Sequence, residues 1–161
     1  MTEKAHALTL PALDPASLPV RTGSAYPAPF AAAVAGREKR ALGTAAGLTH
    51  YGVNLVRLPP GAASSQRHGH SDEDEFVYVL SGEVVLITDG GEQTLAAGMA
   101  AGFPAGAGDA HHLVNRSQQD ALYLEIGDRS GEDKVDYPDI DLMLNRADGP
   151  LVFRHKDGTP Y

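Results

Sequence analysis

The chain has 161 residues and a mass of 16.9 kDa, which is the size of one ordinary domain with a single core. Its formal net charge is −8, and its one basic concentration is the GREKR stretch at 36–40, so the phosphate backbone of a nucleic acid would be repelled. Cysteine is absent, which excludes disulfides and thiolate ligands and leaves imidazoles and carboxylates for any metal site. No segment is apolar enough for a signal peptide or a membrane span. We therefore expect a cytoplasmic protein without nucleic-acid or membrane partners.

Residues 1–40 are predicted to form an extended N-terminal arm. Five of the 11 prolines fall before residue 30, and no hydrophobic period is sustained there. The FAAAVAGREK stretch at 30–39 predicts a short helix within the arm. A small barrel has little room to bury the leucines of the arm, so we expect a homodimer. These leucines are Leu8, Leu10, Leu13 and Leu18.

Residues 41–130 are predicted to form an all-β barrel. Short apolar or alternating runs are separated by Gly, Pro, Asp and Ser, and DGG at 89–91 is typical of a tight hairpin. Many short strands with few helical periods favour a small barrel or sandwich. The expected strands are 48–58, 75–80, 83–88, 92–96, 101–103, 111–115 and 121–126. Residues 131–161 are expected to form a C-terminal extension that packs on the barrel or at a dimer contact.

Two histidines one residue apart suggest a metal site. His68 and His70 share a face if their segment is extended, and a bend through residues 71–74 could return Glu75 to the same face. His111 lies on a later segment. Two or three imidazoles with one carboxylate suit a divalent Fe, Mn, Ni or Zn ion with coordination positions left open.

The same residues resemble the two motifs of the cupin superfamily. The first motif is matched by a glycine, a His-x-His pair, a glutamate and a second glycine, and the second by Gly, Pro-x-Gly and His-x-x-x-Asn. The matching residues are Gly61, His68, His70, Glu75, Gly82, Gly98, Pro104, Gly106, His111 and Asn115. The resemblance spans residues 61–115 and, with flanking strands, about two-thirds of the chain.

The match departs from the usual pattern at three places. One extra residue separates Gly61 from His68, and two extra residues separate Gly106 from His111, which are changes of loop length. Met99 stands where an acidic residue is common. His112 adjoins His111, but only His111 keeps the three-residue spacing to Asn115, so His111 is the predicted ligand.

The resemblance implies a double-stranded β-helix, or jelly-roll barrel, with the four ligands His68, His70, Glu75 and His111 in its mouth. Cupins include dioxygenases, isomerases, decarboxylases and ligand-sensing proteins, so the fold does not fix the function. We expect a small metal-dependent enzyme, of dioxygenase or isomerase type, that acts on an oxygen-bearing small molecule. The alternative is a non-catalytic protein that binds or senses a small molecule.

Further residues are assigned to the site or to the surface. Glu75 is a candidate proton carrier, and Tyr51 and Tyr78 are candidate catalytic residues because they lie on strands near the predicted ligands. His50, Asn54, Arg57 and Tyr123 are weaker candidates for the pocket wall. The charged runs are expected to be solvated; they comprise Asp72, Glu73 and Asp74, and Arg37, Lys39 and Arg40.

Overall fold

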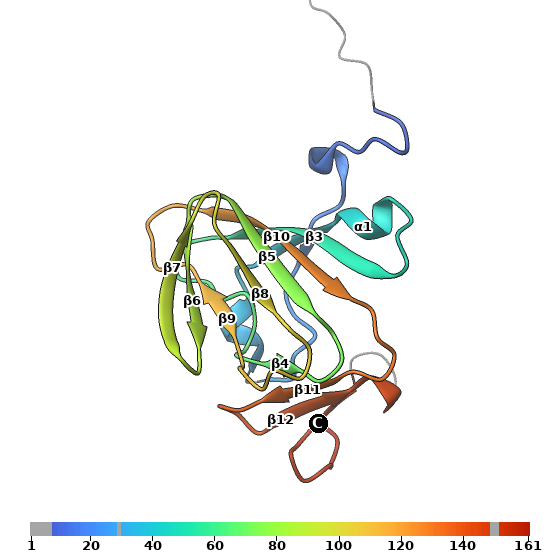
Figure 1. Ribbon diagram of the computed structural model, residues 1–161, viewed down its shortest axis with the longest axis vertical. Helices are drawn as coiled ribbons and strands as arrows, with labels where there is room; N and C mark the ends of the chain where they lie inside the picture. The colour runs from blue at the N-terminus through green and yellow to red at the C-terminus, as the bar shows by residue number, and fades with distance from the viewer. Residues whose placement is uncertain (1–7, 29, 149–151) are drawn as a thin grey trace, which may run out of the picture.

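The computed structural model describes residues 8–28, 30–148 and 152–161, and its regular secondary structure is mostly antiparallel strand (Figure 1). The strands are β1 (Arg21–Thr22), β2 (Glu38–Ala41), β3 (Tyr51–Leu58), β4 (Gly69–His70), β5 (Glu75–Ser81), β6 (Glu83–Thr88), β7 (Gly91–Ala96), β8 (Ala100–Phe103), β9 (His112–Val114), β10 (Ala121–Asp128), β11 (Lys134–Tyr137), β12 (Leu142–Asn145) and β13 (Phe153–Arg154). The helical segments are η1 (Pro15–Ser17), η2 (Phe30–Val34), α1 (Leu42–Ala45) and η3 (Arg146–Asp148).

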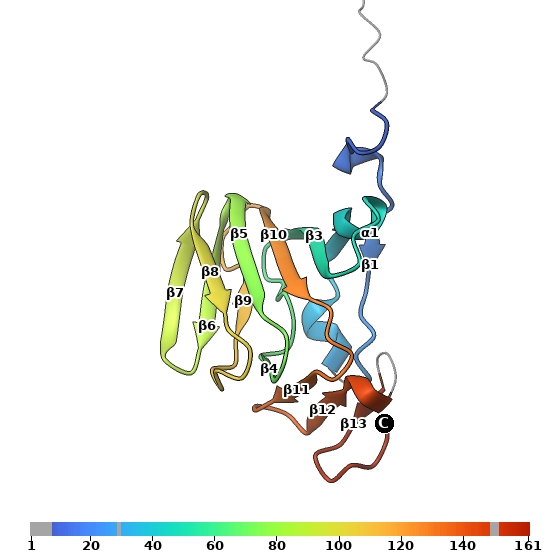
Figure 2. The ribbon, with the colours of Figure 1, turned by 45° about the vertical axis from the view of Figure 1, so that its right-hand side comes forward.

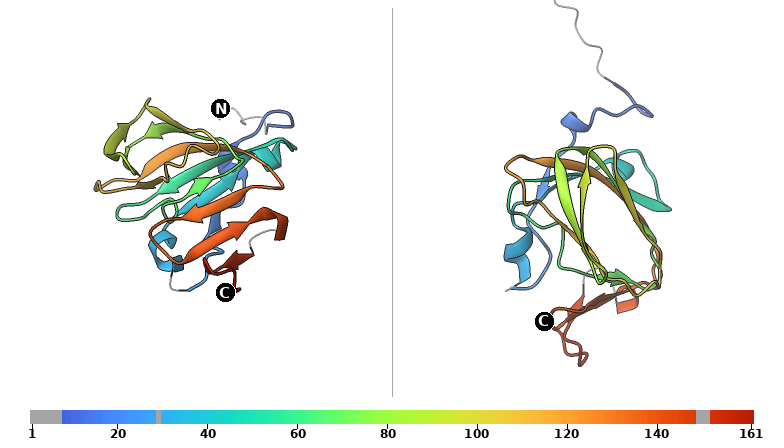
Figure 3. Two further views of the ribbon diagram at one scale, coloured as in Figure 1. Left: turned by 60° about the horizontal axis from the view of Figure 1, so that its bottom comes forward. Right: turned by 60° about the vertical axis from the view of Figure 1, so that its left-hand side comes forward.

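Two sheets face each other and form the barrel. One has six strands in the order β1-β2-β3-β10-β5-β8, and the other has three in the order β7-β6-β9. The right-hand view of Figure 3 looks along the barrel between these sheets. A third sheet, β13-β12-β11-β4, lies at one end of the barrel (Figure 2). The fold is thus the predicted all-β jelly-roll barrel.

Strand alternation explains why the barrel has a core. On β5, Val77 and Val79 are buried inside, while Phe76, Tyr78 and Leu80 lie on the outer face. Tyr123 of β10 pairs with residues of both neighbouring strands and is fully buried. The inward side chains form one apolar cluster, whose largest members are Val56, Leu58, Val77, Val79, Val84, Leu86, Leu95, Leu113 and Tyr123. This cluster fills one end of the barrel and leaves the other end for polar residues.

A second apolar cluster fastens the C-terminal sheet to the N-terminal segment. Val135, Tyr137, Leu142 and Leu144 are buried, and Tyr26, Phe30, Ile140 and Phe153 pack against them. Both segments lie outside the stretch that resembles the cupin motifs. Residues from both ends of the chain therefore build the wall at this end of the barrel.

The expected strands are present with small shifts of their ends, and Thr88 pairs with Gly91 across the predicted hairpin. The helix expected at 30–39 is wrong in extent, because only Phe30–Val34 is helical, as a 3-10 helix, and Glu38–Ala41 is strand β2. Residues 1–7 of the expected arm lie outside the described residues. The later part of the arm supplies β1 and β2 to the six-stranded sheet, because their backbones pair with each other and with β3. None of the helices in the described chain has the length and apolar character that crossing a bilayer requires.

Candidate metal centre

Backbone pairing brings the three predicted histidine ligands to one place. His68 and His111 form an isolated antiparallel bridge, with backbone N–H···O distances of 3.1 and 2.8 Å, so their side chains lie on the same face. His70 is two residues further on and pairs with Val135 of β11. Glu75 is the first residue of β5 and points into the same end of the barrel.

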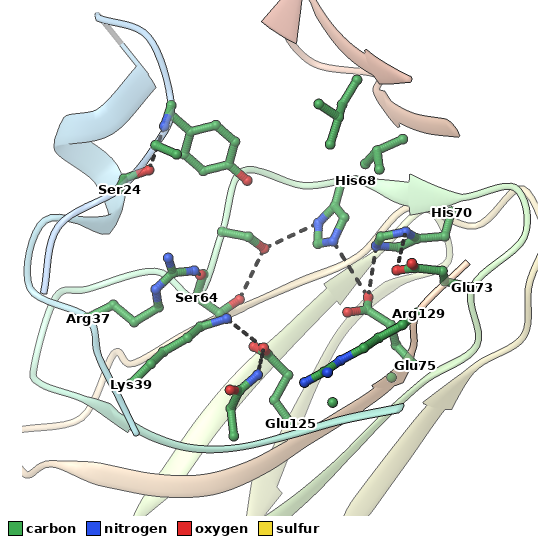
Figure 4. Close-up of a pocket in the computed structure, with 18 of the residues that line it drawn as sticks. Ser24, Arg37, Lys39, Ser64, His68, His70, Glu73, Glu75, Glu125 and Arg129 are labelled. Carbon is green, nitrogen blue, oxygen red and sulfur yellow. Dashed lines mark hydrogen bonds and ion pairs between the residues drawn. The ribbon is translucent and has the colours of Figure 1, made fainter. Parts of the chain in front are cut away.

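The four side chains converge on one oxygen atom. The Nε2 atoms of His111, His70 and His68 lie 3.0, 3.3 and 3.5 Å from Oε2 of Glu75. Figure 4 shows His68 and His70 directed at this carboxylate. This Oε2 atom is buried, and no N–H of the described residues is aligned to donate a hydrogen bond to it. Ligand atoms about 2.1 Å from one ion, in neighbouring octahedral positions, are about 3 Å apart. The ligand atoms of His68, His70 and Glu75 all lie within 4.8 Å of one another, and this spacing and the unsatisfied oxygen fit a cation, with His111 approaching the same oxygen.

Hydrogen bonds fix the orientation of two of the imidazoles. Nδ1 of His70 is 2.7 Å from Oδ2 of Asp133, and Nδ1 of His68 is 2.9 Å from the carbonyl oxygen of Gln66. Both partners are acceptors, so each Nδ1 carries a hydrogen, and in the neutral form of either ring the lone pair of Nε2 faces the centre. This is the tautomer that a metal ion requires.

Electrostatics keep the carboxylate of Glu75 charged. Burial raises its pKa, but the imidazoles of His111, His68 and His70 outweigh burial and hold the pKa well below the usual value. Burial lowers the pKa of His70, but Glu75 and Asp133 outweigh it and raise the pKa to about 9. Glu75 thus has the ionised form in which a carboxylate ligates a cation.

Asp133 and Glu73 belong to the site, although the sequence did not reveal them. Asp133 is fully buried and accepts hydrogen bonds from His70 and from the backbone N–H of Asp72. Glu73 was expected to be solvated, which is wrong: it is 6% exposed, accepts from the N–H of Ser130 at 2.9 Å and lies 3.7 Å from both His70 and Arg146. No spacing rule links Asp133 to His70, because 62 residues separate them and only the pairing of β4 with β11 brings them together.

The centre opens into a cavity of about 850 Å³. Besides the four converging groups, its wall includes Asn54 and Tyr123, two of the residues that the sequence suggested. Burial raises the pKa of Tyr123 well above its usual value, so its hydroxyl stays protonated. Arg37 and Lys39, expected to be solvated, also line the cavity, and they and Arg40 are all half-buried.

The structure corrects the expected positions of the other candidates. Tyr51 and Tyr78 are 43% and 39% exposed and lie outside the cavity wall. Tyr78 alternates with Val77 and Val79, so it faces away from the centre. His50 is exposed, and Arg57 forms ion pairs with Glu38 and Asp120 outside the cavity. His112 hydrogen-bonds to the backbone of Ser65 rather than approaching Glu75.

Comparisons with known proteins identify the family. Residues 54–127 match the family described as Cupin domain. The structure superposes with a TM-score of 0.88 on a sugar phosphate isomerase of the cupin superfamily from Silicibacter pomeroyi, with 45% sequence identity over 94% of this chain and 96% of that one.

Two further structures are similar. A putative sugar phosphate isomerase from Acidithiobacillus ferrooxidans is 36% identical over 73% of this chain and 74% of its own, with a TM-score of 0.68. A predicted oxalate decarboxylase from Thermotoga maritima shares the fold, with 21% identity over 74% of this chain and 99% of its own and a TM-score of 0.57. A search of curated proteins finds no match. The motifs, the barrel and the similarity along nearly the whole chain lead to one conclusion: this chain belongs to the cupin superfamily.

Proposed function

We propose that this chain is a metal-dependent isomerase that interconverts the aldose and ketose forms of a phosphorylated sugar. The observation that carries the proposal is the convergence of three imidazole nitrogens on one buried, unsatisfied carboxylate oxygen at the wall of a large cavity. The similarity to two sugar phosphate isomerases favours an isomerase over the dioxygenase that the cupin resemblance also allowed.

The ligand set of the proposed centre is His68, His70, Glu75 and His111. A divalent Fe, Mn, Ni or Zn ion in this set would supply a Lewis acid that polarises the carbonyl and hydroxyl oxygens of a sugar. All four side chains are at least four-fifths buried, so the surrounding protein limits access of bulk water.

Aldose–ketose interconversion is redox-neutral and moves a proton between two neighbouring carbons and between their oxygens. It therefore needs a base that takes a proton from one carbon and returns it to the next. Glu75 is the proposed proton carrier, because it lines the cavity and keeps 19% of its side chain exposed; for this role its carboxylate would leave the metal. Tyr123 is too deeply buried for this role, since its hydroxyl has no accessible surface.

The reaction is tested by loading the chelator-treated protein separately with Fe(II), Mn(II), Ni(II) and Zn(II). Aldose and ketose phosphates of five and six carbons are then supplied, and their interconversion is followed by NMR in D2O, where deuterium incorporation reports proton transfer. We expect turnover with at least one metal and none after chelation. Binding of sugar phosphates without interconversion under any metal would contradict the isomerase and support the alternative of a non-catalytic binding protein.

Asp133 is proposed to act on the metal through His70. We expect Asp133→Asn to weaken metal binding by about 10- to 100-fold, because the buried carboxylate orients the ring and raises the basicity of Nε2. Competition with a chromophoric chelator measures the affinity, and ¹⁵N NMR of the histidines reports the tautomer of His70. Asp136→Asn is the matched control on the adjoining strand β11, because Asp136 is exposed and its one ion pair among the described residues is with Lys156 at 4.0 Å. Equal affinities for the two variants would contradict the role of Asp133.

The homodimer expected from the sequence stays a proposal. The outer face of β5 supports it, since Phe76, Tyr78 and Leu80 are 42%, 39% and 45% exposed and form a row of large apolar side chains. On the neighbouring strand β10, Leu124 and Ile126 pair with Tyr78 and Phe76 and extend the apolar face. A symmetric dimer would cover this face.

A further inference from the structure

Three cations gather on the face of β1 and β2 that is turned toward the cavity. Arg21 of β1 lies directly opposite Lys39 of β2, so the two side chains share a face. Arg37 precedes Lys39 by two residues, and all three line the cavity. Like charges directly opposite each other destabilise a strand pair. We call Arg21, Arg37 and Lys39 the β1–β2 cation patch.

Among the described residues, a carboxylate partner is found for only one member of the patch. Nζ of Lys39 lies 2.5 Å from Oε1 of Glu125, which also accepts from Asn54 at 3.1 Å. Arg37 donates to the carbonyl oxygen of Ser64, which is a neutral acceptor. Within the part of the chain that the structure describes, neither Arg21 nor Arg37 has a carboxylate at ion-pair distance. The positive charges of these two guanidinium groups beside the cavity are therefore not neutralised by a neighbouring carboxylate.

The wall of the cavity does not share the acidic character of the whole chain. The chain carries a formal net charge of −8, yet five cationic side chains line the cavity against four carboxylates. The cations are Arg21, Arg37, Lys39, Arg129 and Arg146, and the carboxylates are Glu73, Glu75, Glu125 and Asp128. A divalent ion at the proposed centre would add two further positive charges. With that ion bound, the cavity would attract anions although the protein as a whole is acidic.

The patch and the proposed metal centre are on different walls. Figure 4 shows Arg37 and Lys39 across the cavity from His70 and Glu75. A ligand with an anionic group at one end and hydroxyl or carbonyl oxygens at the other would contact both walls. Arginine suits the anionic end, because its planar fork forms paired, charge-assisted hydrogen bonds with phosphate oxygens.

We propose that the β1–β2 cation patch binds the phosphate group of the substrate and directs the carbonyl end of the sugar toward the four proposed ligands. This inference rests on the proposed function and adds the residues that select a phosphorylated sugar. The patch precedes residues 54–127, which match the cupin family, so this segment can set substrate class without changing the ligands.

The test is calorimetric titration of the purified protein with inorganic phosphate. We expect Arg21→Gln and Arg37→Gln each to weaken phosphate binding by about tenfold or more and the double variant to weaken it further, while metal content stays unchanged. Arg37→Lys should lose less affinity than Arg37→Gln, because it keeps the charge without the fork. Arg116→Gln is the control, since Arg116 is paired with Glu92 at the surface and does not line the cavity.

Circular dichroism and thermal melting establish that each variant is folded before its affinity is compared. Unchanged phosphate affinity in the folded double variant would overturn the subsite, and so would an equal loss in Arg116→Gln. If the metal centre alone held the phosphate, the patch variants would not weaken phosphate binding, and the double variant would keep its affinity.

The subsite and the proposed reaction can fail separately. If no sugar phosphate is interconverted, but phosphate binding still depends on Arg21 and Arg37, the isomerase is wrong and the subsite stands. If sugar phosphates are interconverted with a KM that Arg21→Gln and Arg37→Gln leave unchanged, the subsite is wrong and the isomerase stands. In the expected case these variants raise KM at least tenfold for phosphorylated sugars with a smaller change in kcat.

Discussion

Replacing His68 with alanine is expected to lower metal affinity by about 100-fold or more and to abolish turnover. Loss of an orienting partner behind a ligand costs about 10- to 100-fold, and loss of the ligand itself removes a bond to the ion. His68 contributes one of the three Nε2 atoms around Oε2 of Glu75, and its other nitrogen is committed to the carbonyl of Gln66. No other histidine of the described chain is placed to substitute for it, because His112 is held by Ser65.

Metal content by elemental analysis and chelator competition measures this effect independently of activity. His50→Ala is the matched control, because His50 is exposed and lies outside the cavity wall. The control should keep full metal content. A His68→Ala protein that retains the metal content of the unchanged protein would show that the four side chains do not form one shell.

The convergence of the four proposed ligands could be predicted because their order along the chain follows from local backbone geometry. His68 and His70 alternate with Gly69, and Glu75 opens the next strand after a short bend, so spacing alone places three groups near one another. His111 was predicted from the second motif, and its backbone bridge with His68 holds it at the centre. Asn115 donates from Nδ2 to the carbonyl oxygens of Leu58 and Gln119 and anchors the end of the same segment, which accounts for the fixed spacing between His111 and Asn115.

The supporting residues could not be predicted, because distant segments bring them to the site. Asp133 reaches His70 only through the third sheet, and Arg21 reaches the cavity only by pairing with Lys39. In the sequence, Glu73 stands in a run of acids and Arg37 in a run of bases, and such runs are usually solvated. Burial against other elements reverses that expectation. Tyr51 and Tyr78 were misplaced for a simpler reason, because strand proximity does not say which face a side chain takes.

The two glycines of the first motif, Gly61 and Gly82, have the same status in the sequence but different surroundings. Both have a positive φ, +80° and +72°, which non-glycine residues rarely adopt. A Cβ at Gly61 would meet nothing within 4 Å. At Gly82 it would lie 2.5 Å from the carbonyl oxygen of Asp120 and 2.9 Å from Cα of Ala121. The turn between β5 and β6 thus packs directly against the backbone that leads into β10.

We therefore expect Gly82→Ala to lower the free energy of unfolding by about 3–5 kcal/mol, and Gly61→Ala to lower it by only about 1–2 kcal/mol. The left-handed conformation lowers the free energy of unfolding of both variants by a similar amount. The additional loss in Gly82→Ala comes from a clash of the new Cβ with backbone atoms, which no change of rotamer can relieve. A loss of this size is a large part of the 5–15 kcal/mol that is typical of a domain, so Gly82→Ala should unfold at much lower urea concentration. Urea titration followed by circular dichroism compares the two variants with the unchanged protein. Equal losses would mean that the positive φ alone sets the cost, and that the close approach of Gly82 to Asp120 and Ala121 does not restrict this turn.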